Sequence, residues 1–97
     1  MTALAGIRAV VLTQAWAGAF ATELLAMAGA EVIQVEARQR PDGWRMGYDA
    51  PVPAVLRDVP TAQHGWNNSG HYNSVNLNKL GITLDLKTEE GLDLFRR

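Results

Sequence analysis

The chain has 97 residues and a formal net charge of −1; 47% of the residues are hydrophobic and 20% are charged. This length allows one domain at most, and the composition is typical of a folded globular protein rather than a disordered one. The scattered basic residues argue against nucleic-acid binding. The absence of cysteine excludes disulfides, thiolate catalysis and cysteine-ligated zinc, and it suits a reducing compartment.

One apolar stretch, WAGAFATELLAMAGA at residues 16–30, raises the question of export or membrane insertion. It is shorter than the roughly 20 apolar residues that span a bilayer. A signal peptide needs a basic start and a clean apolar middle, whereas Arg8 is the only early charge and Gln14 interrupts the middle. We therefore expect a cytoplasmic protein that does not enter the membrane.

The first third predicts a βαβ unit. Residues 7–13 (IRAVVLT) and 31–37 (EVIQVEA) are short apolar runs typical of buried strands. Between them, residues 17–28 carry apolar side chains at helical spacing among alanines, and Gly29 follows where a left-handed C-terminal cap is expected. Two strands joined by a helix predict the Rossmann-like opening of a parallel sheet.

The middle, residues 38–76, predicts one long ordered loop. It holds all four prolines and keeps neither a helical nor a strand period. Structureless loops longer than about 15 residues are uncommon in compact domains and are often functional. Its aromatic residues Trp44, Tyr48, Trp66 and Tyr72 would allow it to pack against other parts of the protein.

The last 20 residues predict a turn at 78–81, a strand at 82–86 and a helix from Glu89 capped by Thr88. Leu92 and Phe95 give this helix an apolar side. The expected fold class is therefore α/β: a βαβ start, a long loop, a third strand and the start of a second helix, which together make a partial domain.

Side chains that could carry chemistry are few. Glu36 ends the second predicted strand, where an acid can bind a ribose, but Gly18 alone does not make a dinucleotide-binding glycine fingerprint. We expect Glu36 to be a solvated carboxylate, with a nicotinamide enzyme as an alternative. His64 and His71 lie in a Gly- and Asn-rich segment without ligand spacing, so we expect no metal site.

Three segments in order resemble a known family: LAGIRAVVLTQAWAGAFATELLAMAGAEVIQVEA, the loop rich in Trp and Pro, and NLNKLGITLDLKTEEGLDLF. Together they resemble the N-terminal segment of the family III CoA-transferases, which include formyl-CoA and carnitine CoA-transferases and the 2-methylacyl-CoA racemases. The resemblance runs from Leu4 to Phe95. It implies that residues 1–97 form the N-terminal part of the large Rossmann-like domain of such an enzyme, and that this part is truncated.

The resemblance implies a coenzyme A site, with acyl-CoA as the substrate and no metal. The family's loop after the first strand lies against coenzyme A, and Trp16 and Ala17 fall in it, Trp16 where some members carry a polar residue. Arg38 lies one position after the family's usual phosphate-binding arginine. Leu84 and Lys87 match positions that border the adenine and the phosphates, as an apolar wall and a cation.

The resemblance assigns no catalytic residue here. Family transferases move coenzyme A between carboxylic acids through an aspartyl-CoA intermediate, and the racemases use an Asp and a His; both sites lie beyond the matched stretch. We expect the isolated chain to be inactive, and to be a homo-oligomer or to need a missing remainder of the enzyme. A racemase of the same family and a non-catalytic interaction module stay open as alternatives.

Overall fold

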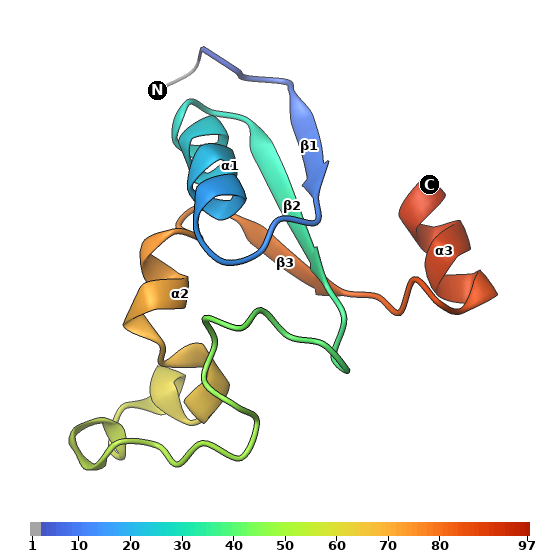
Figure 1. Ribbon diagram of the computed structural model, residues 1–97. Coiled ribbons are helices and arrows are strands. Elements are labelled where there is room, and N and C mark those ends of the chain that lie inside the picture. The colour runs from blue at the N-terminus through green and yellow to red at the C-terminus, as the bar shows by residue number, and fades with distance from the viewer. Residues whose placement is uncertain (1–2) are drawn as a thin grey trace.

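The computed structural model describes residues 3–97 (Figure 1). Its helices and strands, in chain order, are β1 Arg8–Val11, α1 Ala17–Met27, β2 Glu31–Glu36, α2 Gly70–Ser74, β3 Leu80–Thr83 and α3 Glu89–Arg96. The strands form one sheet in the order β1-β2-β3, and both neighbouring pairs are parallel. The predicted partial α/β fold is confirmed.

Helix α1 packs on one face of the sheet against β2, and the core lies between them, while β3 stays exposed. Ala26 and Ala30 pack with Val32 of β2, with Leu4, Ala9 and Val11 against this cluster. Small residues bring helix and sheet close together. A Cβ on Gly18 would lie 2.8 Å from the Thr13 methyl carbon. The Thr13 side chain is held in place, because its hydroxyl donates to the Gln34 amide oxygen and shares a hydrogen bond with the Thr22 hydroxyl.

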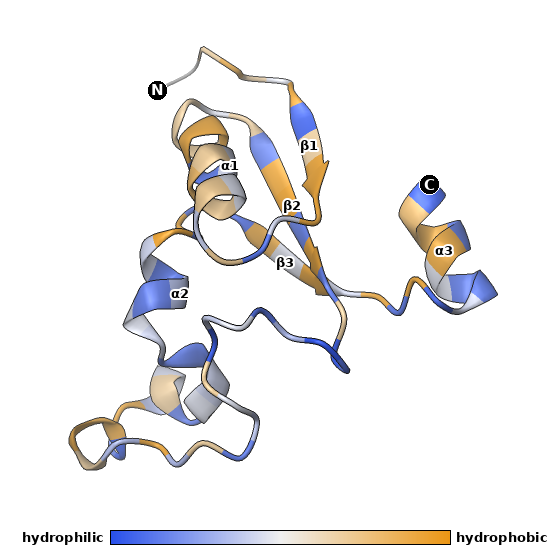
Figure 2. Ribbon diagram, in the orientation of Figure 1, coloured by the Kyte–Doolittle hydropathy of each residue, from blue (hydrophilic) through white to orange (hydrophobic). Residues whose placement is uncertain are grey.

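The other face of the sheet is open. Val10 pairs with Ile33, and Ile33 with Leu80, so the three side chains form one row on this face. Val10 is 47% and Leu80 56% exposed, and Ile82 further along β3 is 43% exposed. In Figure 2, hydrophobic colour alternates with hydrophilic colour along β2, and α3 stands off beyond the end of β3.

The sequence predicts the βαβ unit well. Helix α1 begins at the expected residue and ends one residue early, and Gly29 has the expected left-handed backbone, with φ of 103°. Both strands are shorter at their ends than predicted. In α3, the Thr88 side chain accepts the predicted capping hydrogen bond from the Gly91 amide.

Two predictions for the second half are wrong. The third strand was expected at residues 82–86, but β3 is Leu80–Thr83, and Leu80 and Gly81 are strand rather than turn. The end of β2 sets the end of β3: Glu36 ends β2 and pairs with Thr83. Beyond this pair, the Leu84 N–H donates to the Glu36 carbonyl oxygen at 3.2 Å, and the chain then leaves the sheet. The loop at 38–76 also contains α2, capped by Ser69, and three short 3-10 turns.

Across residues 3–97, no helix has both the length and the apolar character that a membrane crossing requires.

Candidate functional site

The carboxyl ends of the three parallel strands meet at one edge of the sheet (Figure 1). The loop at residues 12–16 follows β1, residues 37–40 follow β2 and residues 84–88 follow β3. Ligands of open α/β sheets bind outside this edge, because the connecting loops and helix N-termini gather there. The five residues predicted to bind coenzyme A all lie in these three connections or directly beside them.

A hydrogen-bonded side chain places the loop after β1. Gln34 on β2 is 6% exposed, and its amide nitrogen donates to the Thr13 carbonyl oxygen at 2.6 Å. The Thr13 hydroxyl donates back to the Gln34 amide oxygen at 3.2 Å. Ala15 then adopts a left-handed backbone with φ of 58°, which turns the chain into α1. The start of α1 is thereby tied to the middle strand.

A cavity of about 440 Å³ lies at this edge, on the face away from α1. Its walls include the apolar side chains of Leu12, Val35 and Leu84 and the cations of Arg40 and Lys87, with polar Gln14 and the Asp85 carboxylate beside them. Leu84 and Lys87 were predicted to bind coenzyme A, and both line this cavity. Arg40 was missed, although it is a basic residue in the connection after β2. Apolar walls beside cations suit a flat ring that carries phosphates.

A second cavity, of about 650 Å³, includes Arg38 in its lining. Gln34 and Glu36 of β2 also line it, whereas Val35 lines the first cavity, so the alternation of β2 side chains puts the two cavities on opposite faces. Arg38 is thus separated from Leu84 and Lys87.

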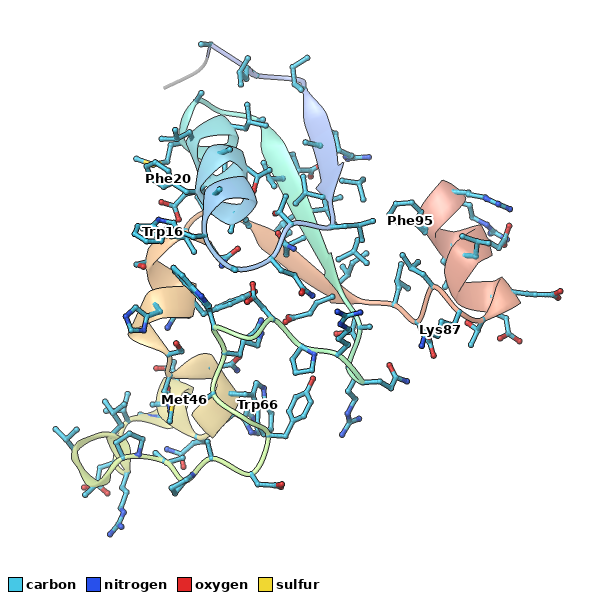
Figure 3. All side chains as sticks on the ribbon, in the orientation of Figure 1. Trp16, Phe20, Met46, Trp66, Lys87 and Phe95 are labelled. Carbon is cyan, nitrogen blue, oxygen red and sulfur yellow. The ribbon has the colours of Figure 1, made fainter. Side chains whose placement is uncertain are left out.

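Trp16 and Ala17 line neither of the two cavities. Trp16 precedes α1 and is 65% exposed, with its ring 5.6 Å from that of Trp44. Ala17, also exposed, is the first residue of α1. Figure 3 shows Trp16 beside α1, and Lys87 across the molecule near α3. The five predicted residues therefore share one edge of the sheet but do not form one cluster.

Sequence reasoning missed an ion pair in the second cavity. Arg45 donates to both carboxylate oxygens of Glu36, at 2.8 and 3.1 Å, and the two side chains are only 17% and 15% exposed. The expectation of a solvated Glu36 is therefore wrong. The Arg45 guanidinium also lies 3.8 Å from the centre of the Tyr72 ring. No sequence pattern links these three residues, since they belong to a strand, a loop and α2.

Two pKa values are shifted by the surroundings. Burial raises the pKa of Tyr72, and the nearby Arg45 charge opposes part of that rise. Burial lowers the pKa of Lys79, and the Glu23 carboxylate opposes part of that change. The Lys79 ammonium donates to the Ala19 carbonyl at 2.8 Å and to the Asn76 side chain at 2.9 Å, so it serves to join α1 to the segment before β3.

The histidines belong to aromatic packing. His64 stacks on Trp66 with ring centres 4.5 Å apart, and His71 meets Trp44 edge-on at 5.6 Å. Within the described part of the chain, no three His, Cys, Asp or Glu residues are grouped as metal ligands would be.

Known proteins with similar sequences are CoA-transferases. A formyl-CoA:oxalate CoA-transferase from Streptomyces avermitilis is 37% identical over 95% of this chain and 19% of its own length. A succinate–glutarate CoA-transferase from Agrobacterium fabrum is 36% identical over 97% of this chain and 22% of its own length. A succinyl-CoA:mesaconate CoA-transferase from Haloarcula hispanica is 37% identical, also over 22% of its length. The chain thus spans about a fifth of these relatives.

A solved structure has the same fold. The crystal structure of a hypothetical protein from Mycobacterium tuberculosis, Rv3272, superposes with a TM-score of 0.64 and 27% identity, over 95% of this chain and 21% of that protein. The sequence profile described as CoA-transferase family III matches residues 4–97. The resemblance stated from the sequence is confirmed: this chain belongs to CoA-transferase family III.

Proposed function

We propose that this chain forms part of the coenzyme A binding surface of an enzyme that moves coenzyme A between carboxylic acids. Family membership supports the reaction class, and the relatives named above are all transferases by name, which favours transfer over racemisation. The observation that carries the proposal is the cavity at the carboxyl edge of the sheet, where Leu84 and Lys87 meet.

The residues at this edge of the sheet have different roles in this proposal. Leu12 and Leu84 form apolar walls against the adenine ring, and Lys87 and Arg40 bind phosphate oxygens through charge-assisted hydrogen bonds. Trp16 and Ala17, in the loop after β1, lie toward the thioester end of the ligand. Arg38 faces the other cavity, so among the five residues predicted from the sequence it contributes least to binding coenzyme A.

We further propose that the aspartate that attacks the thioester is not among residues 1–97. Such an aspartate needs a reactive, accessible carboxylate. Asp42 is 4% exposed, and both of its oxygens accept backbone amide hydrogen bonds. Asp85 accepts a hydrogen bond from the Lys87 amide within its own turn. Arg97 donates to Asp93 in an i,i+4 pair on α3. These three carboxylates serve local structure. Asp49 and Asp58 are exposed in the long loop, and the resemblance to the family matches neither of them to the nucleophile.

Calorimetric titration of coenzyme A into the 97-residue chain tests the binding proposal. We expect weak binding that Lys87→Ala reduces by about tenfold, which is the effect of losing one charge-assisted phosphate contact. Arg38→Ala should have a smaller effect. The exposed Arg57, in the loop remote from the sheet edge, provides the matched control, and Arg57→Ala should bind as the wild type does. No heat at millimolar coenzyme A would remove the proposal.

A thioester exchange assay tests the second part. The isolated chain, mixed with succinyl-CoA and a free carboxylic acid, should transfer no coenzyme A. Transfer at a rate above the uncatalysed background would show that one of the carboxylates in this chain is the nucleophile.

A further inference from the structure

The loop between β1 and α1 contains an unfavourable backbone conformation. Ala15 has φ of 58°, in the left-handed region. Glycine occupies this region freely, whereas for an alanine the equilibrium is shifted away from it by roughly fivefold or more. Neighbouring contacts must therefore hold Ala15 in place.

Asp42 supplies such a contact. Its carboxylate is buried, and Oδ2 accepts the Ala15 N–H at 2.9 Å. The other oxygen, Oδ1, accepts the Trp44 N–H, also at 2.9 Å. Two backbone donors thus meet two acceptor oxygens. An asparagine offers only one oxygen, and its NH₂ group would face the second N–H without an acceptor.

Asp42 is itself held from the end of β2. Its backbone N–H donates to Glu36 Oε2 at 2.6 Å, and Glu36 is fixed by its ion pair with Arg45. The Trp16 ring also packs on Trp44, two residues after Asp42. Both the backbone and an aromatic side chain of the β1–α1 loop therefore rest on residues 42–44.

We propose that Asp42 is a positioning residue: it holds Ala15 in the left-handed conformation and so keeps the loop at residues 14–17 in its binding-competent form. The expected effect on the affinity for coenzyme A rests on the proposed function above. When only a fraction of molecules has the competent loop, the apparent dissociation constant rises by the inverse of that fraction. Asp42 therefore sets affinity without touching the ligand.

Hydrogen exchange measured by NMR on the full 97-residue chain tests the holding role directly. In Asp42→Asn, the amides of Ala15 and Trp44 should exchange at least about tenfold faster, because faster exchange means that the loop opens more often. Amides of β2, such as those of Val32 and Val35, should keep their protection. Asp49→Asn, at an exposed aspartate in the same long loop, should change neither.

Rescue by glycine separates positioning from general destabilisation. Ala15→Gly removes the penalty of the left-handed conformation, so the Asp42→Asn/Ala15→Gly double variant should regain about fivefold in coenzyme A affinity over Asp42→Asn alone. A merely structural Asp42 would show no rescue. Unchanged exchange at Ala15, equal loss of protection throughout the sheet, or no rescue in chains that bind coenzyme A would each overturn the proposal.

Two further outcomes are decisive. If the wild-type chain binds no coenzyme A but Ala15 exchange responds as expected, the proposed function has failed and the holding role of Asp42 stands. If Asp42→Asn does not fold, the single variant Ala15→Gly decides instead. Relief of the unfavourable conformation at residue 15 favours the loop that Asp42 holds, so the Trp44 amide, bound to the other oxygen of Asp42, should exchange more slowly than in the wild type. An unchanged rate at Trp44 would overturn the assignment.

Discussion

Arg45 joins more parts of the molecule than its place in a loop suggests. It pairs with Glu36 at the end of β2, lies over the Tyr72 ring of α2, and donates to the Trp66 carbonyl at 3.2 Å. Removing one partner of a buried pair costs about 3–5 kcal/mol, because the other charge stays buried and uncompensated. Arg45 is therefore one of the side chains that anchor the long segment to the sheet, beside Asp42.

Tyr72 leads to a prediction at high pH. Because burial raises its pKa in the folded state above 10.0, the unfolded chain ionises first. The stabilisation is fully present below pH 10.0 and is lost as the pH rises through the folded-state pKa. Tyr72→Phe keeps the ring under Arg45 but removes the titrating hydroxyl. Its free energy of unfolding should therefore fall less than that of the wild type above pH 10.0.

Urea unfolding at a series of pH values measures this difference. The lowered pKa of Lys79 has the opposite effect, with stability gained as the pH rises toward 10.5, but it acts equally in both proteins and cancels. If the free energy of unfolding changes with pH in the same way for the wild type and Tyr72→Phe, burial does not raise the pKa of the Tyr72 hydroxyl, and the prediction is wrong.

The turn between β3 and α3 places Leu84 and Lys87 at the cavity. Asp85 organises it: its side chain accepts the Lys87 N–H at 3.0 Å, and its carbonyl accepts the Thr88 N–H at 3.1 Å and the Thr88 hydroxyl at 2.9 Å. Helix α3 then starts directly above this turn. The packing is close at Gly91, where an added Cβ would lie 2.0 Å from the Asp85 carbonyl oxygen.

Gly91→Ala should therefore displace the turn from α3. Although alanine favours a helix by up to about 1 kcal/mol over glycine, a clash with backbone atoms typically costs 1–3 kcal/mol and should win. We expect lower helix content by circular dichroism and weaker binding of coenzyme A. Gly70→Ala, at the first residue of α2 with no atom within 4 Å of the added Cβ, should be neutral or stabilising. Equal effects of both substitutions would contradict the clash.

For the molecule as a whole, the open face of the sheet is unfavourable in water because it exposes apolar side chains. The exposed side chains of Val10, Leu80 and Ile82 lie on the face of the sheet opposite to α1, and every residue of β3 is exposed. Surfaces of this kind in folded domains mark contacts with further protein. We therefore keep the prediction that this chain associates, either with itself or with further parts of an enzyme.

Light scattering over a concentration series tests self-association. The weight-average mass of the chain should rise with concentration, and the double variant Leu80→Thr/Ile82→Thr should reduce that rise, because threonine suits a strand but is more polar. Val55→Thr is the control, since Val55 is 85% exposed and lies in the long loop. A constant monomer mass at high concentration would exclude self-association.

Local signals were the ones that could be predicted from the sequence. Helix α1, the left-handed Gly29 and the Thr88 cap depend on residues within a few positions of one another, so their patterns are legible in the sequence. The boundary of β3 could not be read in this way. The alternation at residues 82–86 predicted a strand, but the length of β2 determined where pairing stops.

In the candidate site, too, local features could be predicted from the sequence and long-range contacts could not. The sequence by itself determined the parallel βαβ start, through short-range patterns, and the family, through the resemblance of three segments in order. Leu84 and Lys87 were named from that resemblance, and the sequence placed Leu84 in a strand rather than in the turn where it lies. Only the tertiary structure decided that Arg38 faces away from them, that Arg40 joins them, and that Asp42 holds Ala15. Those contacts connect segments without a common period, and their geometry exists only once the sheet has brought the ends of its strands together.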